Sequence, residues 1–166
     1  IRTEACGMVR DDGGWKVRPT GPRGEQEIRA KIVIGADGVE SMVGRWAGLD
    51  TRVASRDMES CAQYVVSNIA FDPDAIYLHF TSRWAPGGYG WIFPKSVGVA
   101  NVGLGMVALK SDGRNARQYL DEYLARYFPQ GTVVGLTVGG VIVATTVKRT
   151  TTDGVMLAGD AAHMIN

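Results

Sequence analysis

The chain has 166 residues, of which 45% are hydrophobic and 21% are charged, as in ordinary globular domains. The net charge of +1, from 18 basic and 17 acidic residues, leaves no basic excess for nucleic-acid binding. Cys6 and Cys61 have neither the spacing of a metal site nor that of a disulfide framework, so we expect reduced thiols, no metal and a cytoplasmic location.

The chain is predicted to open with a meander of strands. Residues 2–10 form the first strand, an Asp-Asp-Gly-Gly turn follows, and residues 15–18 form the second. A third strand spans 26–34 and ends in Ile-Val-Ile, a run typical of a parallel strand buried on both faces. After a turn, Ser41 is a suitable N-cap for a short helix that ends near Gly48.

The middle of the chain is predicted to be mostly β-structure, with one long helix at 114–128. Apolar residues recur along this helix at three- and four-residue spacing, from Ala116 to Tyr127, which indicates a packing face. The last strand leads into a helix start near the C-terminal end. Because the chain begins at Ile1 and stops one turn into that helix, we expect an internal piece of a longer protein. The remaining predicted strands are 60–70, 75–81, 89–96, 98–107, 132–138, 140–148 and 154–158.

In two segments a predicted strand runs into a turn that contains an aspartate next to a glycine. The strand at 154–158 leads to Gly159 and Asp160, where a ligand can approach the backbone and a carboxylate can accept hydrogen bonds from sugar hydroxyls. The strand ending at residue 34 leads to Asp37 and Gly38. Alone, each aspartate is equally a helix cap or a turn residue. Together they favour one ligand at a shared sheet edge.

A third segment places aromatic residues at every second position. Tyr89, Trp91 and Phe93 are predicted to share one strand face, opposite Gly90 and Ile92. Such a wall suits flat rings or long apolar chains, and it suits an ordinary core as well.

In a neighbouring predicted strand, Gly103 and Gly105 alternate with large residues, which indicates either close approach of a ligand or a crowded sheet corner. Of the two histidines, His79 is predicted to be structural and His163 to be a surface helix residue. No catalytic residue can be assigned.

At these segments the chain resembles a known family. Residues 33–38 and 157–162 resemble the internal FAD motifs of the para-hydroxybenzoate hydroxylase superfamily, and the Tyr-x-Trp-x-Phe-Pro run at 89–94 resembles the hallmark of its geranylgeranyl reductase branch. The resemblance implies an α+β, α/β fold: part of a Rossmann-like FAD-binding domain interleaved with a mostly antiparallel substrate-binding sheet. The implied domain ranges are 1–50 and 149–166 for the FAD-binding part and 51–148 for the substrate-binding part.

The resemblance also implies roles for individual residues. FAD would contact Ala5, Asp37, Gly38, Gly159, Asp160 and Ala161, and an isoprenoid chain would lie against Tyr89, Trp91 and Phe93. The implied reaction is saturation of C=C bonds in geranylgeranyl chains of archaeal-type lipids by hydride from reduced flavin, with an external donor of the NAD(P)H or ferredoxin class and peripheral contact with a membrane.

Two alternatives stay open at this point. The same FAD motifs serve aromatic-ring monooxygenases and flavin halogenases, and a prenyl- or lipid-binding module without enzymatic activity could use the aromatic face alone. The glycine-rich phosphate loop of the superfamily lies outside the chain, so we expect the isolated chain to bind FAD poorly.

Overall fold

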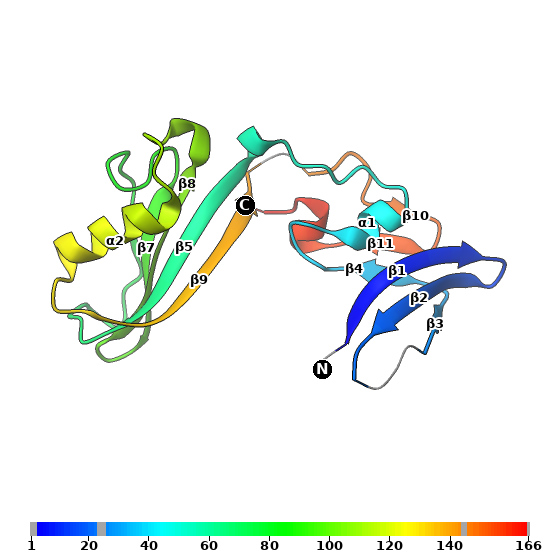
Figure 1. The fold of residues 1–166 in the computed structure, drawn as a ribbon, viewed down its shortest axis with the longest axis horizontal. Coiled ribbons are helices and arrows are strands. Elements are labelled where there is room, and N and C mark those ends of the chain that lie inside the picture. The colour runs from blue at the N-terminus through cyan, green and yellow to red at the C-terminus, as the bar shows by residue number, and fades with distance from the viewer. Residues whose placement is uncertain (1–2, 23–25, 144–145, 166) are drawn as a thin grey trace. The chain divides into compact units, whose positions relative to one another are not determined.

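The computed structural model describes residues 3–22, 26–143 and 146–165. They divide into two compact units: one comprises residues up to Val53 together with those from Ile142 onward, and the other is Ala54–Val141 (Figure 1). The sequence-based domain ranges were divided at 50 and 148 instead.

The first unit begins with an antiparallel meander. Strand β1 (Glu4–Asp11) pairs with β2 (Gly14–Thr20), which pairs with β3 (Ile28–Ala30). Met8 and Trp15 from this meander are buried against Val155. The meander is therefore confirmed, and its core contact comes from the far end of the chain.

The same unit contains a second small sheet, in which β10 (Thr151–Thr152), β11 (Val155–Leu157) and β4 (Val33–Gly35) lie in that order. Strands β11 and β4 are parallel, as the Ile-Val-Ile run predicted. The single strand expected over 26–34 is wrong, because its two halves, β3 and β4, belong to different sheets.

The prediction that this parallel strand is buried on both faces is also wrong. Ile34 is 61% exposed, and Met156, its partner on β11, is exposed as well. Val155 and Leu157 point to the other face and are buried. The sheet thus has one packed face among the residues described.

Two short helical segments follow the parallel strands. Helix α1 (Met42–Trp46) has Ser41 as its N-cap, as predicted, with the Ser41 hydroxyl accepting from the Gly44 N–H at 3.2 Å. After β11 the chain makes a single 3₁₀ turn, η3 (Gly159–Ala162), instead of the α-helix start that the sequence indicated. His163 ends this turn in the left-handed region, at φ 55°.

The second unit is a mostly antiparallel sheet with strands in the order β6-β7-β8-β5-β9. Two strands were expected over 132–148; the described residues of this range, 132–143 and 146–148, contain one strand, which ends at Ile142. The strand bounds are Met58–Ser67 for β5, Tyr77–His79 for β6, Tyr89–Ser96 for β7, Val99–Val107 for β8 and Thr132–Ile142 for β9; short 3₁₀ turns, η1 (Ser55–Asp57) and η2 (Ala108–Lys110), flank β5 and β8.

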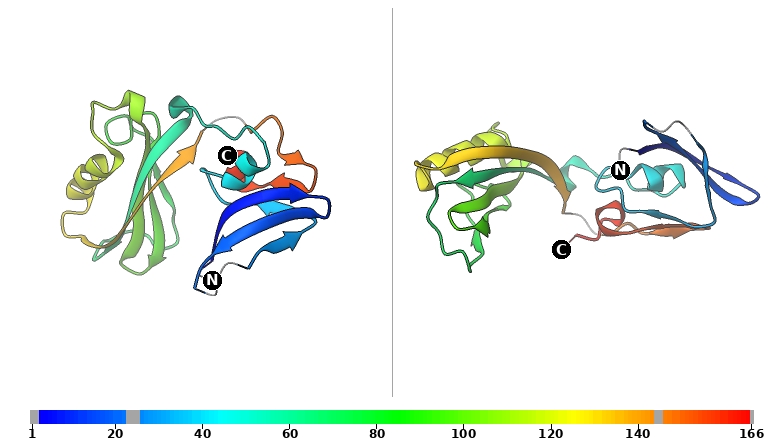
Figure 2. Two further views of the ribbon diagram at one scale, coloured as in Figure 1. Left: turned by 45° about the vertical axis from the view of Figure 1, so that its right-hand side comes forward. Right: turned by 90° about the horizontal axis from the view of Figure 1, so that it is seen from below.

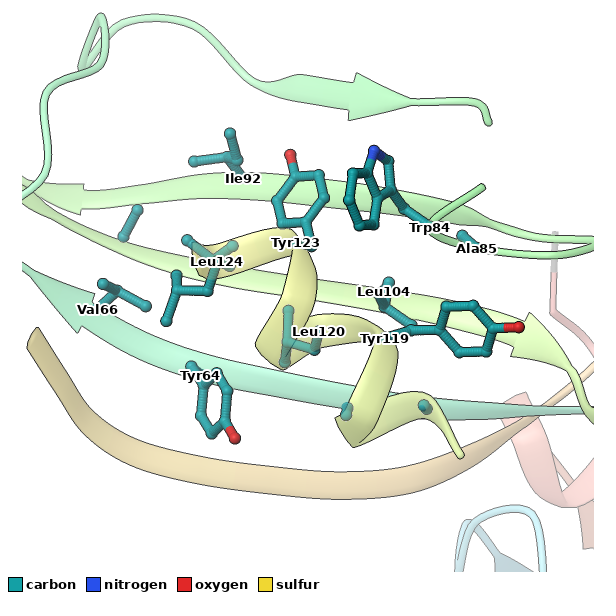
Figure 3. Packing of buried hydrophobic residues seen from close by; sticks show 14 of the residues in the cluster. Tyr64, Val66, Trp84, Ala85, Ile92, Leu104, Tyr119, Leu120, Tyr123 and Leu124 are labelled. Atoms are coloured by element: carbon teal, nitrogen blue, oxygen red, sulfur yellow. The ribbon is translucent and has the colours of Figure 1, made fainter. Parts of the chain in front are cut away.

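Helix α2 (Ala116–Tyr127) packs on one face of this sheet (Figure 2). Asn115 and Gln118 form a capping box that satisfies N–H groups at the start of the helix. The predicted apolar stripe is buried except for Tyr127, which is exposed at the helix end. Figure 3 shows the helical stripe packed against side chains of β5, β7 and β8 in the core. The labelled residues include Tyr119, Leu120, Tyr123 and Leu124 from the helix, and Tyr64, Val66, Ile92 and Leu104 from the strands.

None of the helices in the described ranges has the length and apolar character needed to cross a membrane.

Candidate functional site

The two predicted strand-end aspartates follow neighbouring strands. Gly35 of β4 is the register partner of Leu157 of β11, and the Ala158 N–H donates to the Gly35 carbonyl at 2.9 Å. Because the strands are parallel, the segments carrying Asp37 and Asp160 both leave the sheet at its carboxyl edge, where α/β sheets bind ligands.

The Asp37 carboxylate is already engaged in hydrogen bonds within the chain. Its carboxylate accepts hydrogen bonds from the Ser41 hydroxyl at 2.7 Å and from the N–H groups of Met42 and Val43 at 2.7 and 3.0 Å. Burial acts to raise the pKa of Asp37, but these hydrogen bonds outweigh it and hold the pKa below its ordinary value. Asp37 therefore fixes the start of α1, and Gly38 beside it makes the turn at φ 82°.

Asp160 has a different environment. Its side chain is exposed at the start of η3, and no hydrogen bond to another described residue occupies its carboxylate. Gly159 has φ 59°, and a β-carbon built on it would meet nothing within 4 Å. Ala161, in contrast, is buried. The backbone and the carboxylate at 159–160 are thus open to an approaching group.

A cleft of about 480 Å³ brings Ala5 together with Asp37, two residues that the resemblance had associated with one cofactor. Gly159, Asp160 and Ala161 are not among its lining residues, which are Glu4, Ala5, Asp37, Glu40, Met42, Val43, Arg45 and Trp46.

The two histidines have different outcomes. His79 is structural, as predicted: its Nδ1 lies 2.5 Å from the Tyr123 hydroxyl within the aromatic cluster beneath α2. His163 is not a surface residue, because it is only 6% exposed. Within the described ranges its buried Nε2 has no hydrogen-bond partner. The sequence suggested exposure because it predicted an α-helix here, whereas the left-handed turn directs this side chain inward.

The aromatic residues of β7 form an open wall in the second unit. Gly90 and Ile92 are buried beneath α2, whereas Tyr89 is 38% exposed and Trp91 and Phe93 are half-buried on the opposite face. The Trp91 and Phe93 rings stack at 5.9 Å with an interplanar angle of 16°. The predicted sharing of one face is confirmed, and the wall is not packed into a solid core.

Strand β8 provides a floor beside this wall. Trp91 lies opposite Gly103, and Tyr89 lies opposite Gly105. A β-carbon on Gly103 would lie 2.6 Å from two carbons of the Trp91 indole, so the ring occupies the space that a side chain at this position would need. Side chains of neighbouring strands thus crowd the backbone at Gly103 and Gly105, which favours the crowded sheet among the two alternatives that the sequence left open.

Strand β5 lies on the other side of β8 from β7. Cys61 and Gln63 are the register partners of Gly105 and Gly103, and both are half-buried on the same face as the wall. The Trp91 indole N–H donates to the Gln63 side-chain carbonyl at 2.9 Å. We call the surface formed by Tyr89, Trp91, Phe93, Gly103, Gly105, Cys61 and Gln63 the ledge face.

Two ionisable groups lie at the Gly105 end of the ledge face. A β-carbon on Gly105 would lie 2.9 Å from Glu59 Oε2 and 3.0 Å from Cys61 Sγ. Burial raises the pKa of Glu59, and the positive charge of the Lys110 ammonium partly offsets this rise. Burial, followed by the negative charge of Glu59, raises the pKa of the Cys61 thiol to about 11. Cys61 is therefore a neutral thiol at ordinary pH.

Gln63, Cys61 and Glu59 were missed in the sequence. Their alternate spacing places them on one face of a strand, but their proximity to Trp91 depends on the β5-β8-β7 register. A long antiparallel register cannot be read from the residues of a single strand.

The fold is shared with several larger enzymes. The flavin-dependent brominase Bmp2 superposes with a TM-score of 0.72 at 14% identity, over 96% of this chain and 43% of that one. At such low identity the likeness concerns the fold alone. It agrees with the predicted α+β, α/β class, in which part of a Rossmann-like domain is interleaved with a mostly antiparallel sheet.

Residues 57–141 match the family model of the geranylgeranyl reductase catalytic domain. The chain is 42% identical to the digeranylgeranylglycerophospholipid reductase of Methanocella arvoryzae, over 99% of this chain, and 43% identical to that of Methanosarcina acetivorans, over 98%. A solved geranylgeranyl bacteriochlorophyll reductase-like protein from Thermoplasma acidophilum superposes with a TM-score of 0.90 at 37% identity, over 98% of this chain and 42% of that one.

The chain belongs to the geranylgeranyl reductase family. It spans about two fifths of the length of the curated relatives that it matches, 42% and 41% for the two reductases above.

Proposed function

We propose that the protein containing this chain is a flavin-dependent reductase that saturates C=C bonds in the geranylgeranyl chains of isoprenoid lipids. The observation that carries the proposal is the ledge face. Its aromatic wall is partly exposed, its floor consists of glycine backbone, and the family match covers all of it. The curated relatives are named as reductases of lipids that carry such chains.

The ledge face suits a long apolar chain. Tyr89, Trp91 and Phe93 offer ring faces to CH and C=C groups, and the absence of a side chain at Gly103 lets the Trp91 ring lie close to the β8 backbone. An isolated alkene is a poor electrophile, so the reaction depends on holding it in register in a site without water. The wall supplies apolar contact area for this purpose.

The first unit suits a dinucleotide cofactor, for which we propose FAD. The Asp160 carboxylate is exposed and free to accept hydrogen bonds from ribityl hydroxyls, and Gly159 leaves open space beside it. Asp37 and Gly38 shape the neighbouring strand end, Ala161 is buried within the η3 turn, and Ala5 lines the cleft that the adenosine part would use. A reduced flavin supplies hydride to carbon.

The overall reaction adds one hydride and one proton across each C=C bond. The two electrons are restored by an external donor of the NAD(P)H or ferredoxin class, and a lipid substrate requires the protein to make peripheral contact with a membrane. In this reaction the residues of the chain bind and orient the substrate and exclude water.

Anaerobic turnover tests the reductase proposal. The full-length protein, reduced with dithionite, should add two hydrogen atoms to each bond that it saturates in a digeranylgeranyl glycerophospholipid, as followed by mass spectrometry. A product that contains an added oxygen atom, formed only in air, would contradict the proposal and indicate a monooxygenase.

Flavin content tests the cofactor site. Asp160→Ala should deprive the purified full-length protein of its flavin absorbance, whereas Asp12→Ala, at an exposed turn of the same unit, should retain it. A colourless wild-type protein that binds prenyl lipids would contradict the enzyme assignment.

A further inference from the structure

We infer that Gln63 is a positioning residue for the substrate wall: its side-chain carbonyl holds the Trp91 indole against Gly103, so that the indole N–H is not left free toward an apolar chain. The inference rests on the proposed function and extends it to a residue outside the aromatic run.

The three residues form a row across the sheet. Gln63 of β5 and Trp91 of β7 are both register partners of Gly103, on the intervening β8. The indole spans the central strand, and its N–H meets the Gln63 Oε1 at 2.9 Å. An indole nitrogen is only a donor, so the amide oxygen of Gln63 must be the partner.

The floor leaves little freedom for the ring. A β-carbon on Gly103 would lie within 2.7 Å of the indole Nε1 and 2.6 Å of Cε2 and Cζ2. The indole therefore lies directly on the backbone, and its height above the sheet is fixed by contact. The hydrogen bond to Gln63 then fixes its rotation.

Trp91 in turn supports both neighbouring rings. It stacks on Phe93 at 5.9 Å and meets Tyr89 edge to face, also at 5.9 Å. A rotation of the indole would disturb both contacts, so the orientation of one side chain sets that of the whole wall.

The chemistry of the proposed substrate explains why an internal acceptor is needed. A hydrocarbon chain offers no acceptor to an indole N–H, and an unpaired N–H beside it must retain a water molecule or lose a hydrogen bond. Gln63 satisfies the N–H from the β5 end of the same sheet face. The half-buried ring can thus be covered by an apolar chain without leaving a donor unpaired.

A direct test follows the Trp91 indole N–H by NMR in the full-length protein labelled with ¹⁵N-tryptophan, with the resonance assigned from Trp91→Phe. Gln63→Leu should shift this resonance and speed its exchange with water. Gln63→Glu, which keeps an acceptor at this position, should leave it near its original place. An unchanged resonance in Gln63→Leu would overturn the inference.

The second measurement is steady-state reduction of a geranylgeranyl lipid. Gln63→Leu should raise KM about two- to tenfold, the range of one hydrogen bond, and Gln63→Glu should restore most of the loss. Gln130→Leu, the same exchange at an exposed position in the same unit, should behave as wild type. A purely structural role would reduce the amount of active protein and kcat at an unchanged KM, and this result would also overturn the inference.

The two proposals fail in different ways. If wild type and Gln130→Leu both fail to reduce any prenyl lipid, the proposed function is wrong and the substrate role of Gln63 is wrong with it. If both are active and Gln63→Leu keeps its KM, only the role of Gln63 is wrong.

Discussion

The two faces of the β5-β8-β7 sheet differ in how the space above them is filled. Toward α2, alternate residues of these strands are buried, among them the fully buried Val66, Val102 and Leu104. On the ledge face the same strands carry Gly103, Gly105 and half-buried aromatic residues. One face is filled by the chain itself, while the other leaves room for a different molecule, so substitutions on the two faces should affect different properties.

The largest effect on stability is expected on the filled face. Leu104→Ala removes a fully buried side chain beneath α2 and should lower the free energy of unfolding of the full-length protein by about 2–5 kcal/mol. Urea unfolding measures the change. Val97→Ala, in the exposed β7-β8 turn, should change it by less than about 0.5 kcal/mol. Equal losses of unfolding free energy in Leu104→Ala and Val97→Ala would contradict the assignment of Leu104 to a tightly packed core.

A smaller loss is expected on the ledge face, together with a loss of activity. Gly103→Ala forces the Trp91 indole off the floor and should cost about 1–3 kcal/mol of stability while raising KM for the prenyl lipid. Gly139→Ala, where a β-carbon meets nothing within 4 Å, is the matched control. If both glycine variants bind substrate normally, the floor is not part of the site.

A similar contrast distinguishes the two aspartates that follow β4 and β11: the Asp37 carboxylate accepts hydrogen bonds within the chain, whereas the Asp160 carboxylate accepts none from the described residues. Asp37→Ala leaves three donors without their acceptor and should destabilise the protein by about 1–2 kcal/mol. Asp160→Ala removes no hydrogen bond among the described residues, so it should change stability by less than about 0.5 kcal/mol while abolishing flavin binding. Thermal unfolding of the flavin-free proteins measures both changes, and a reversed order would contradict this assignment.

The last effect concerns the ionisation of Cys61, which does not change stability near neutral pH. The pKa of Cys61 is about 11 in the folded protein, against an ordinary value of 9.0, so the folded state keeps its thiol proton after the unfolded state has lost it. This contribution to stability is therefore complete below pH 9 and is lost as pH rises from 9 to 11. Cys61→Ala should flatten the stability profile over that range.

Alkylation of Cys61, followed by peptide mass spectrometry, gives an independent measurement of its pKa. The rate with iodoacetamide should keep rising to about pH 11, because only the thiolate reacts. In Glu59→Gln, which removes a nearby negative charge, the rise should come at lower pH. A rate that levels off near pH 8 would show that Cys61 is not shielded.

The sequence predicted features that depend on local periodicity. The shared face of Tyr89, Trp91 and Phe93 follows from the two-residue repeat of a strand, and the buried stripe of α2 follows from its helical spacing. Two apolar runs, each followed by an aspartate, also indicated a shared sheet edge, which the parallel pairing of β4 and β11 provides.

Features that depend on tertiary contacts were not predictable. The break between β3 and β4 arises because neighbouring residues join different sheets. The burial of His163 follows from a left-handed turn in place of a helix. The occupied state of the Asp37 carboxylate and the meeting of Gln63 with Trp91 depend on side-chain positions that one strand alone does not specify.

The indole of Trp91 also acts as a brace across the sheet. Strands β5 and β7 do not pair with each other, because β8 lies between them, yet the bond from Trp91 to Gln63 joins them directly. A slip of β7 by one residue would turn Trp91 to the α2 side and break that bond. The amides of β5 and β7 should therefore open together in hydrogen exchange, because the contact that orients the indole also keeps the two strands in alignment.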